Sequence, residues 1–92
     1  MARDIEHALY QRLMNTKFSF IERGIQSIEY IYSSVSNEYP DLCDNTYYCY
    51  ENCKNGNNQP EWNHTVRNAL QSLKNHDDHV RYTGRKGYWE FY

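Results

Sequence analysis

The stretch that most constrains the fold is residues 60–92, where a helical pattern is followed directly by a pattern of strands. Apolar residues of its first part recur at the i, i+3, i+4 and i+7 spacing of one helix face: Val66, Ala69, Leu70 and Leu73. Pro60 suits the first turn of a helix, where its missing N–H costs nothing. The pattern therefore predicts an amphipathic helix over residues 60–75.

The sequence after this helix is aromatic and alternating. Val80 and Tyr82 alternate with Arg81, and residues 88–92 are a second run of strand formers. The intervening residues 83–87 hold two glycines, which suit positive-φ turn positions, and two cations. These features predict a β-hairpin with a basic tip.

Together, the two patterns resemble a known family of domains. The helix reads Val66-Arg67-x-x-Leu70-Gln71-x-Leu73, and the hairpin reads Gly84-Arg85-x-Gly87-Tyr88-Trp89. This combination resembles the winged helices found at the C-terminal end of some restriction endonucleases, including methyl-directed ones. The resemblance covers residues 60–92 and implies a winged helix-turn-helix that binds DNA. No nuclease domain accompanies it, so cleavage is not implied.

The preceding sequence favours further helices. A short helix is expected over residues 4–14, with Asp4 as its N-cap. A longer one is expected over residues 19–38, ending before Pro40, with Gly24 at a close helix crossing. Its predicted buried stripe is Ile21, Ile25, Ile28, Tyr32 and Val35.

A third helix could begin at Asp41 and run through Leu42, Tyr47 and Tyr50, before a polar loop over residues 54–59. The expected fold class is α+β, mainly α: a winged helix-turn-helix with an additional N-terminal helix and a C-terminal β-hairpin wing. Residues 1–92 would form a single domain, with 1–18 as a helical extension and 19–92 as the winged-helix core.

Charge is distributed unevenly along the chain. Residues 1–59 carry five Lys/Arg and eight Asp/Glu, whereas residues 60–92 carry five Lys/Arg, four Asp/Glu and three histidines. The C-terminal part is therefore mildly basic although the whole chain has a net charge of −2. This balance predicts modest non-specific affinity for DNA, or binding strengthened by a homodimer formed through the 4–14 and 21–35 helices.

The outward face of the 60–75 helix is polar, and it would read double-stranded DNA from the major groove. Arg can donate bidentately to guanine, and Asn or Gln can pair with adenine. Candidates for base edges are Asn63, Arg67, Asn68 and Gln71, with His64 beside them and Lys74 placed for phosphate. In the 81–88 wing, Arg81, Arg85 and Lys86 could contact phosphates or the minor groove. The alternative is an ordinary solvated face and a soluble hairpin tip.

Three cysteines raise the question of a metal site. Cys43, Cys49 and Cys53 could form a tetrahedral Cys₃His zinc site with His64, although the spacing fits no standard zinc finger. They could equally be partly buried free thiols or form a disulfide, and no cofactor is then required. His64 cannot both bind zinc and contact DNA.

No sequence motif indicates an enzyme. Residues 76–79, His-Asp-Asp-His, lie where a helix must turn into the hairpin, and polar residues suit such a turn. Phosphate-binding glycine loops, H-E-x-x-H and G-x-S-x-G are absent from the sequence. The N-terminal residues lack the apolar block of a signal peptide, and no apolar run could cross a membrane, so a cytoplasmic location is expected.

The function expected from these features is that of a small DNA-binding protein, such as a transcriptional regulator. A winged-helix module for protein–protein interaction is the alternative. So is a detached DNA-recognition subunit of a nuclease system, reading modified DNA.

Overall fold

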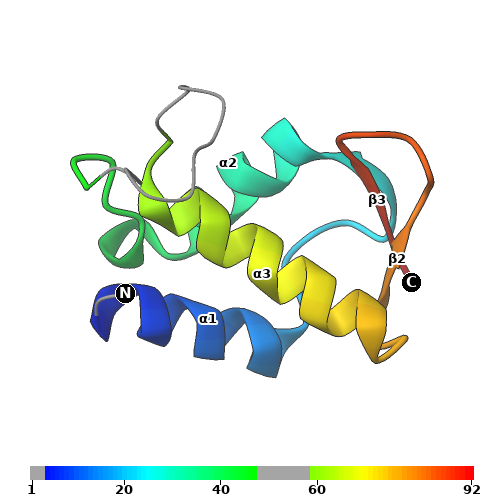
Figure 1. Cartoon of the computed structure of the whole chain (residues 1–92), viewed down its shortest axis with the longest axis horizontal. Coiled ribbons are helices and arrows are strands. Elements are labelled where there is room, and N and C mark those ends of the chain that lie inside the picture. Colours follow the sequence, from blue (N-terminus) through cyan, green and yellow to red (C-terminus); the bar gives the residue numbers. More distant parts are fainter. Residues whose placement is uncertain (1–3, 48–58) are drawn as a thin grey trace.

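The computed structural model describes residues 4–47 and 59–92, which form three α-helices and a three-stranded antiparallel sheet. The elements follow in the order α1 (Asp4–Thr16), β1 (Gly24–Ser27), α2 (Ile28–Glu38), the 3₁₀ turn η1 (Pro40–Leu42), α3 (Glu61–Asn75), β2 (Val80–Tyr82) and β3 (Tyr88–Phe91). Helices α1 and α3 lie side by side, and the sheet stands at one end of them (Figure 1). The expected α+β, mainly helical class is confirmed. Within the described residues, no helix is long and apolar enough to cross a membrane.

The sheet has the strand order β1-β3-β2, so β3 is the central strand. Strands β2 and β3 form the expected hairpin, with Val80 opposite Phe91 and Tyr82 opposite Trp89. On its other side, β3 pairs with β1, which places Gly24 opposite Phe91. Val80 and Phe91 face the helices and are almost completely buried.

The core lies between the three helices and the inner face of the sheet. The predicted apolar stripe of α3 is buried as expected, with Val66, Ala69 and Leu70 fully inaccessible to solvent. Leu9 and Leu13 of α1 are also fully buried, as is Phe18, whose ring centroid lies 5.6 Å from that of Phe91. Burial of each large side chain contributes about 1.5–3 kcal/mol to folding.

The apolar stripes that were expected to pair two copies lie within this core. Leu9 and Leu13 on α1, and Ile31 and Val35 on α2, have no exposed surface. Helix α1, expected as an extension, is thus part of the hydrophobic core. These four side chains are not free to form an interface with a second chain.

The prediction of one helix over residues 19–38 is wrong in its first half. Gly24–Ser27 is strand β1, and the helix begins only at Ile28, where the Ser27 hydroxyl accepts a hydrogen bond of 3.2 Å from Tyr30 N. Gly24 has a φ of +123°, a conformation suited to glycine and incompatible with a helix interior. Pairing with β3 gives the backbone of this segment its hydrogen-bond partners. A helical turn with Gly24 in its interior would be less stable, because glycine disfavours the helix. Ile25, expected in the core, is 63% exposed on the outer face of the sheet.

The third helix expected from Asp41 is also wrong over the residues that can be described. After the short turn η1, the chain is non-helical from Cys43 to Tyr47. Asp44 Oδ1 accepts hydrogen bonds from Thr46 N and Thr46 Oγ1, at 2.9 and 2.5 Å, which favours a local turn over a helix. Tyr50 and most of the expected 54–59 loop lie outside the described residues.

Helix α3 ends in a motif that fixes the direction of the hairpin. Asp77 N donates to Lys74 O, and Asp78 N donates to Leu73 O at 2.9 Å, which is the Schellman pattern of hydrogen bonds. Asp77 takes the left-handed conformation that this motif requires, with a φ of 53°. Tyr92 Oη donates to Asp77 O and Oδ1, so the end of the sheet is attached to the end of α3.

Candidate nucleic-acid interface

The outward face of α3 presents uncharged polar and basic side chains, and Glu61, at the first residue of the helix, borders it closely enough to act on the pKa of His64. At 100° per residue, the side chains of this face span about 140° of the helix circumference. They are Asn63, His64, Arg67, Asn68, Gln71, Lys74 and Asn75. Arg67, Asn68 and Gln71 are exposed, whereas Asn63, His64 and Lys74 are half-buried. The structure therefore brings all six predicted residues of this helix to one side of it.

Arg67 and His64 interact with each other. Arg67 Nη2 donates a hydrogen bond of 3.0 Å to His64 Nδ1, so the ring proton of the neutral imidazole is on Nε2. Burial, and then the neighbouring Arg67 charge, lower the pKa of His64, which favours this neutral form. The contact orients the Arg67 guanidinium and leaves its other N–H groups available to a ligand.

Asn63 is less exposed than the other predicted base readers, Arg67, Asn68 and Gln71. Its Oδ1 atom is buried and has no hydrogen-bond partner within the described residues. The neighbouring Trp62 indole donates to Asn45 Oδ1 at 2.9 Å and packs edge-on against Tyr32. The amide of Asn63 is therefore directed partly into the protein, and Arg67, Asn68 and Gln71 are the side chains best exposed for contact.

The hairpin tip is exposed and locally well ordered by hydrogen bonds. Thr83 Oγ1 accepts from Arg85 N at 3.1 Å and donates to Tyr88 O at 3.0 Å. The Arg85 guanidinium carbon lies 4.3 Å from the centroid of the Tyr88 ring, a cation–π contact that holds the charge over the hairpin. Lys86 is exposed at the same tip.

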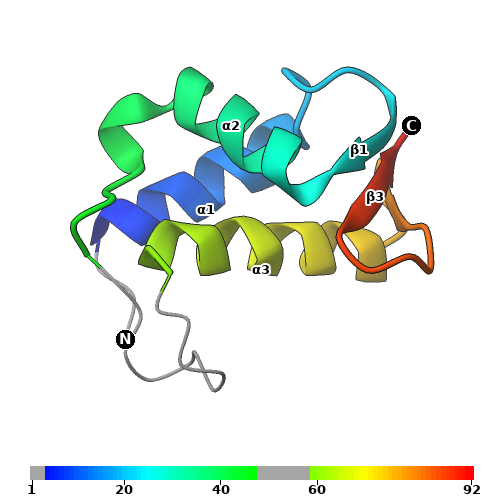
Figure 2. The same cartoon turned by 90° about the horizontal axis from the view of Figure 1, so that it is seen from above.

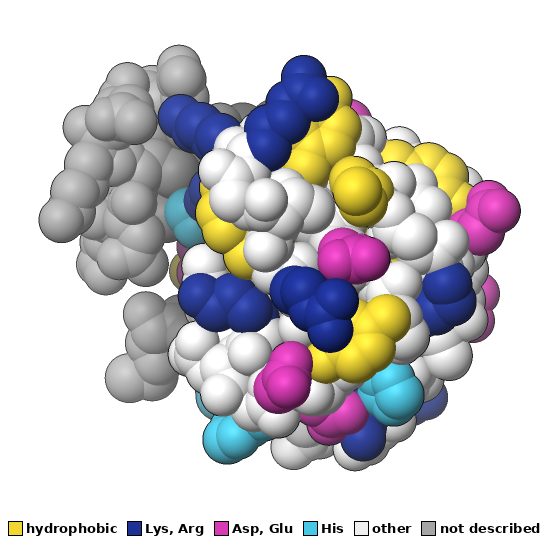
Figure 3. Space-filling model, turned by 90° about the vertical axis from the view of Figure 1, so that its right-hand side faces the viewer, with side chains coloured by type: hydrophobic (Ala, Val, Ile, Leu, Met, Phe, Trp, Pro, Cys, Tyr) yellow, Lys and Arg dark blue, Asp and Glu magenta, His cyan; other side chains and the backbone are white. Residues whose placement is uncertain are grey.

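Arg81 lies apart from this tip, on the outer face of the sheet. It is the cross-strand neighbour of Glu90, and its Nη1 atom is 3.4 Å from Glu90 Oε1. Its guanidinium carbon is 4.3 Å from the centroid of Tyr92. Figure 3 shows basic, acidic and hydrophobic side chains interspersed on this side of the molecule. The charge of Arg81 is thus partly balanced, whereas Arg85 and Lys86 form no ion pair within residues 4–47 and 59–92.

The hairpin tip and the free side of α3 face the same way. In Figure 2, α1 and α2 both lie on one side of α3, and the β2–β3 loop bends toward the opposite side. The loop is also attached to α2, because Ile28 N donates to Gly87 O at 2.8 Å. With 15 residues, α3 is about 22 Å long. An α-helix with its side chains is about 10–12 Å across, so it fits a major groove about 12 Å wide.

The predicted zinc site can be described only in part. Cys49 and Cys53 lie outside the described residues, while Cys43 is buried. Burial raises the pKa of the Cys43 thiol to about 12, which disfavours the thiolate that binds zinc. In the described part of the chain, no group of three or more His, Cys, Asp or Glu side chains could hold a metal ion.

Comparisons with known proteins add no assignment to this geometry. The chain matches no family model, no curated protein and no solved structure. The sequence assigned no role to Lys17 and Arg23, which lie together beside the end of the sheet. Arg23 is held near Lys17 by hydrogen bonds to the main-chain oxygens of Phe18 and Ile21, which the sequence pattern does not reveal.

Proposed function

We propose that this chain is a winged-helix domain that binds duplex DNA, with α3 in the major groove and the β2–β3 hairpin on the adjacent backbone. The arrangement of the elements supports this. A strand between the first two helices pairs with a hairpin that follows the third helix, and the tip of this hairpin flanks the free side of α3. The chain would use its third helix for recognition and its hairpin as the wing.

The observation that carries the proposal is the charge of one surface. The chain has a net charge of −2, yet beyond its first residue, Glu61, helix α3 carries Arg67 and Lys74 and no carboxylate, and the adjoining hairpin tip carries Arg85 and Lys86. A duplex presents phosphates on both sides of its major groove, so a surface whose one helical carboxylate is at the helix end meets little repulsion where it approaches. An ordinary solvated face in an acidic chain would be expected to carry both signs of charge along its length, whereas the single carboxylate of α3 is at its first residue.

Within this proposal, the side chains divide into two roles. Arg67, Asn68 and Gln71 are exposed and have the donors and acceptors that distinguish base edges. Lys74, Arg85 and Lys86 would contact phosphates and so position the helix without reading sequence. Arg81, paired with Glu90, would contribute less than these three.

Arg67→Ala is the direct test of α3. After selection of a preferred site from random duplexes, we expect the variant to lose about 1–3 kcal/mol of specific binding, measured by fluorescence anisotropy. Arg12→Ala is a matched control, because Arg12 is exposed on α1 on the side opposite Tyr10, which contacts α3 through Ser72. Equal affinities of both variants and the parent protein would contradict a recognition role for α3.

A second comparison concerns the biological context of the binding. A DNA-recognition subunit that reads modified DNA would bind a methylated duplex more tightly than a plain duplex of the same sequence. A transcriptional regulator has no such requirement. The absence of any duplex binding at low salt would instead favour a protein partner.

A further inference from the structure

A second polar site lies beside the end of the sheet. A solvent-open pocket of about 290 Å³ is formed between the turn after α1, the segment before β1 and the two ends of the hairpin. Its lining residues are Thr16, Lys17, Ser19, Arg23, His79 and Tyr92. None of them belongs to α3 or to the hairpin tip, so the pocket is separate from the proposed DNA-binding surface.

Arg23 gives the pocket a positive charge that the described residues do not neutralise. Its guanidinium donates only to main-chain oxygens, those of Phe18 and Ile21, with Nη2 2.9 Å from Ile21 O. Its carbon also lies 5.3 Å from the centroid of the Phe91 ring. These contacts hold the guanidinium in place without a carboxylate partner.

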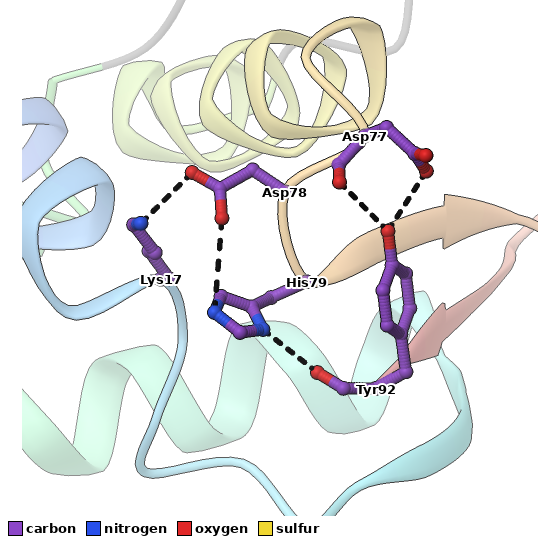
Figure 4. A network of polar contacts seen from close by, with 5 residues as sticks. All are labelled: Lys17, Asp77, Asp78, His79 and Tyr92. Atoms are coloured by element: carbon purple, nitrogen blue, oxygen red, sulfur yellow. Dashed lines mark hydrogen bonds and ion pairs between the residues drawn. The ribbon is translucent and has the colours of Figure 1, made fainter.

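The remaining charges are connected by a network of polar contacts (Figure 4). Lys17 Nζ forms an ion pair of 2.9 Å with Asp78 Oδ2, and His79 Nε2 lies 3.7 Å from Asp78 Oδ1. His79 Nδ1 donates to the main-chain oxygen of Tyr92 at 3.0 Å. Asp78 pairs with Lys17, whereas no carboxylate among the described residues pairs with Arg23.

The backbone around the pocket adopts conformations that are unfavourable for L-residues. Two residues that line the pocket have a positive φ, Lys17 at 54° and His79 at 67°. Such conformations persist only where surrounding contacts enforce them, and they are concentrated at ligand sites. Here, the Lys17–Asp78 ion pair joins the two segments concerned.

We propose that this pocket binds a small oxoanion of the phosphate class, held by the Arg23 guanidinium, the Lys17 ammonium group and the Ser19 hydroxyl. Guanidinium and ammonium groups make charge-assisted hydrogen bonds to phosphate oxygens. The Ser19 side chain is exposed and its hydroxyl has no hydrogen-bond partner among the described residues, so it can donate to a ligand. The volume of the pocket is close to the lower limit for small-molecule sites.

The test is an NMR titration of the ¹⁵N-labelled protein with sodium phosphate, against sodium chloride at matched ionic strength. Phosphate is expected to produce saturable shifts in the amides of residues 16–23 and 78–79, with a Kd on the order of 1 mM. Arg23→Gln should weaken binding about tenfold or more, in line with the loss of a charge-assisted contact. Arg12→Gln, which removes a charge from the exposed side of α1, should leave phosphate affinity unchanged.

Ser19→Ala is the second variant, since it removes a surface hydroxyl without disturbing any described contact. It should weaken phosphate binding while leaving the thermal unfolding temperature unchanged. Shifts that do not saturate, that chloride reproduces, or that survive in both pocket variants would overturn the proposal.

Two further titrations, with a phosphate monoester and with a short duplex, identify the source of the oxoanion. A phosphate monoester such as glycerol phosphate should shift the same amides if the pocket accepts a small phosphorylated molecule. A short duplex that shifts these amides when free phosphate does not would overturn the proposal, because the pocket would then be a contact for DNA. DNA binding by α3 could fail while phosphate binding succeeds, and the reverse, so the two proposals are tested independently.

Discussion

Removal of both cations at the hairpin tip should change how DNA binding depends on salt. Each cation that neutralises a phosphate releases counterions, and the slope of log K against log salt is about −0.9 per phosphate contacted. At most four described cations lie on the proposed surface without a carboxylate partner: Arg67, Lys74, Arg85 and Lys86. Arg81 is left out of this count because it pairs with Glu90.

These contacts set an upper limit for the parent protein. Four contacts give a slope of about −3.6, which corresponds to a loss of affinity of about 150-fold between 50 and 200 mM salt. The variant Arg85→Ala/Lys86→Ala would retain two contacts and a slope of about −1.8, or a loss of about 12-fold over the same range. The two proteins should therefore differ most at low salt and converge as salt is raised.

The assay is fluorescence anisotropy of a labelled random-sequence duplex at several salt concentrations. The control is Arg12→Glu, which changes the net charge by the same two units at an exposed site on α1, away from α3 and the hairpin tip. If the control flattens the salt dependence as much as the hairpin variant does, the effect is one of total charge. The hairpin would then have no specific role as a wing, and the reasoning above would be refuted.

Three further predictions concern stability and reactivity. Ser27→Ala should destabilise the protein by about 1 kcal/mol through loss of the α2 N-cap, with a fall of about 4–8 °C in Tm by circular dichroism; an unchanged Tm would argue against the cap. In a Cys49→Ser/Cys53→Ser background, Cys43 should react with a thiol reagent at pH 8 only as fast as the chain unfolds, and rapid labelling of the folded protein would contradict its burial. Because burial lowers the pKa of His64 below its usual 6.5, the unfolded chain binds the proton more readily, so stability should fall as the pH drops from 7 to 5. Urea unfolding should show a weaker pH dependence for His64→Gln, and an equal dependence would exclude His64 as its source.

The elements that the sequence predicted correctly are those whose signal is local. Helix α3 was expected over residues 60–75 and occupies Glu61–Asn75, because its apolar stripe and its proline at the start both act within the helix itself. The β2–β3 hairpin was also predictable, since its two glycines adopt the positive φ angles that the turn requires, 87° at Gly84 and 83° at Gly87. In both cases, neighbouring residues decide the structure.

Strand β1 could not be predicted in the same way. Ile21, Ile25 and Ile28 have helical spacing, but Ile25 projects from the outer face of a strand whose partner is near the other end of the chain. Four residues are too few for alternation to be distinguished from a helical turn. The sequence predicted which side chains of α3 point outward, because its buried apolar stripe fixes the opposite face. It could not predict the contact of Arg67 with His64 or of Arg81 with Glu90, because these depend on side-chain geometry.

The pairing of β1 with β3 limits how this protein can be engineered. All the side chains proposed to meet DNA lie in residues 60–92, which suggests a portable reading module. Yet β3 takes hydrogen bonds from β1, Phe91 packs on Phe18, and α3 covers Leu9 and Leu13. A peptide cut at Pro60, or grafted onto another scaffold, would expose these surfaces and lose its fold. Exchange of specificity between such proteins would have to be made by substitution on α3 rather than by transplantation of the segment.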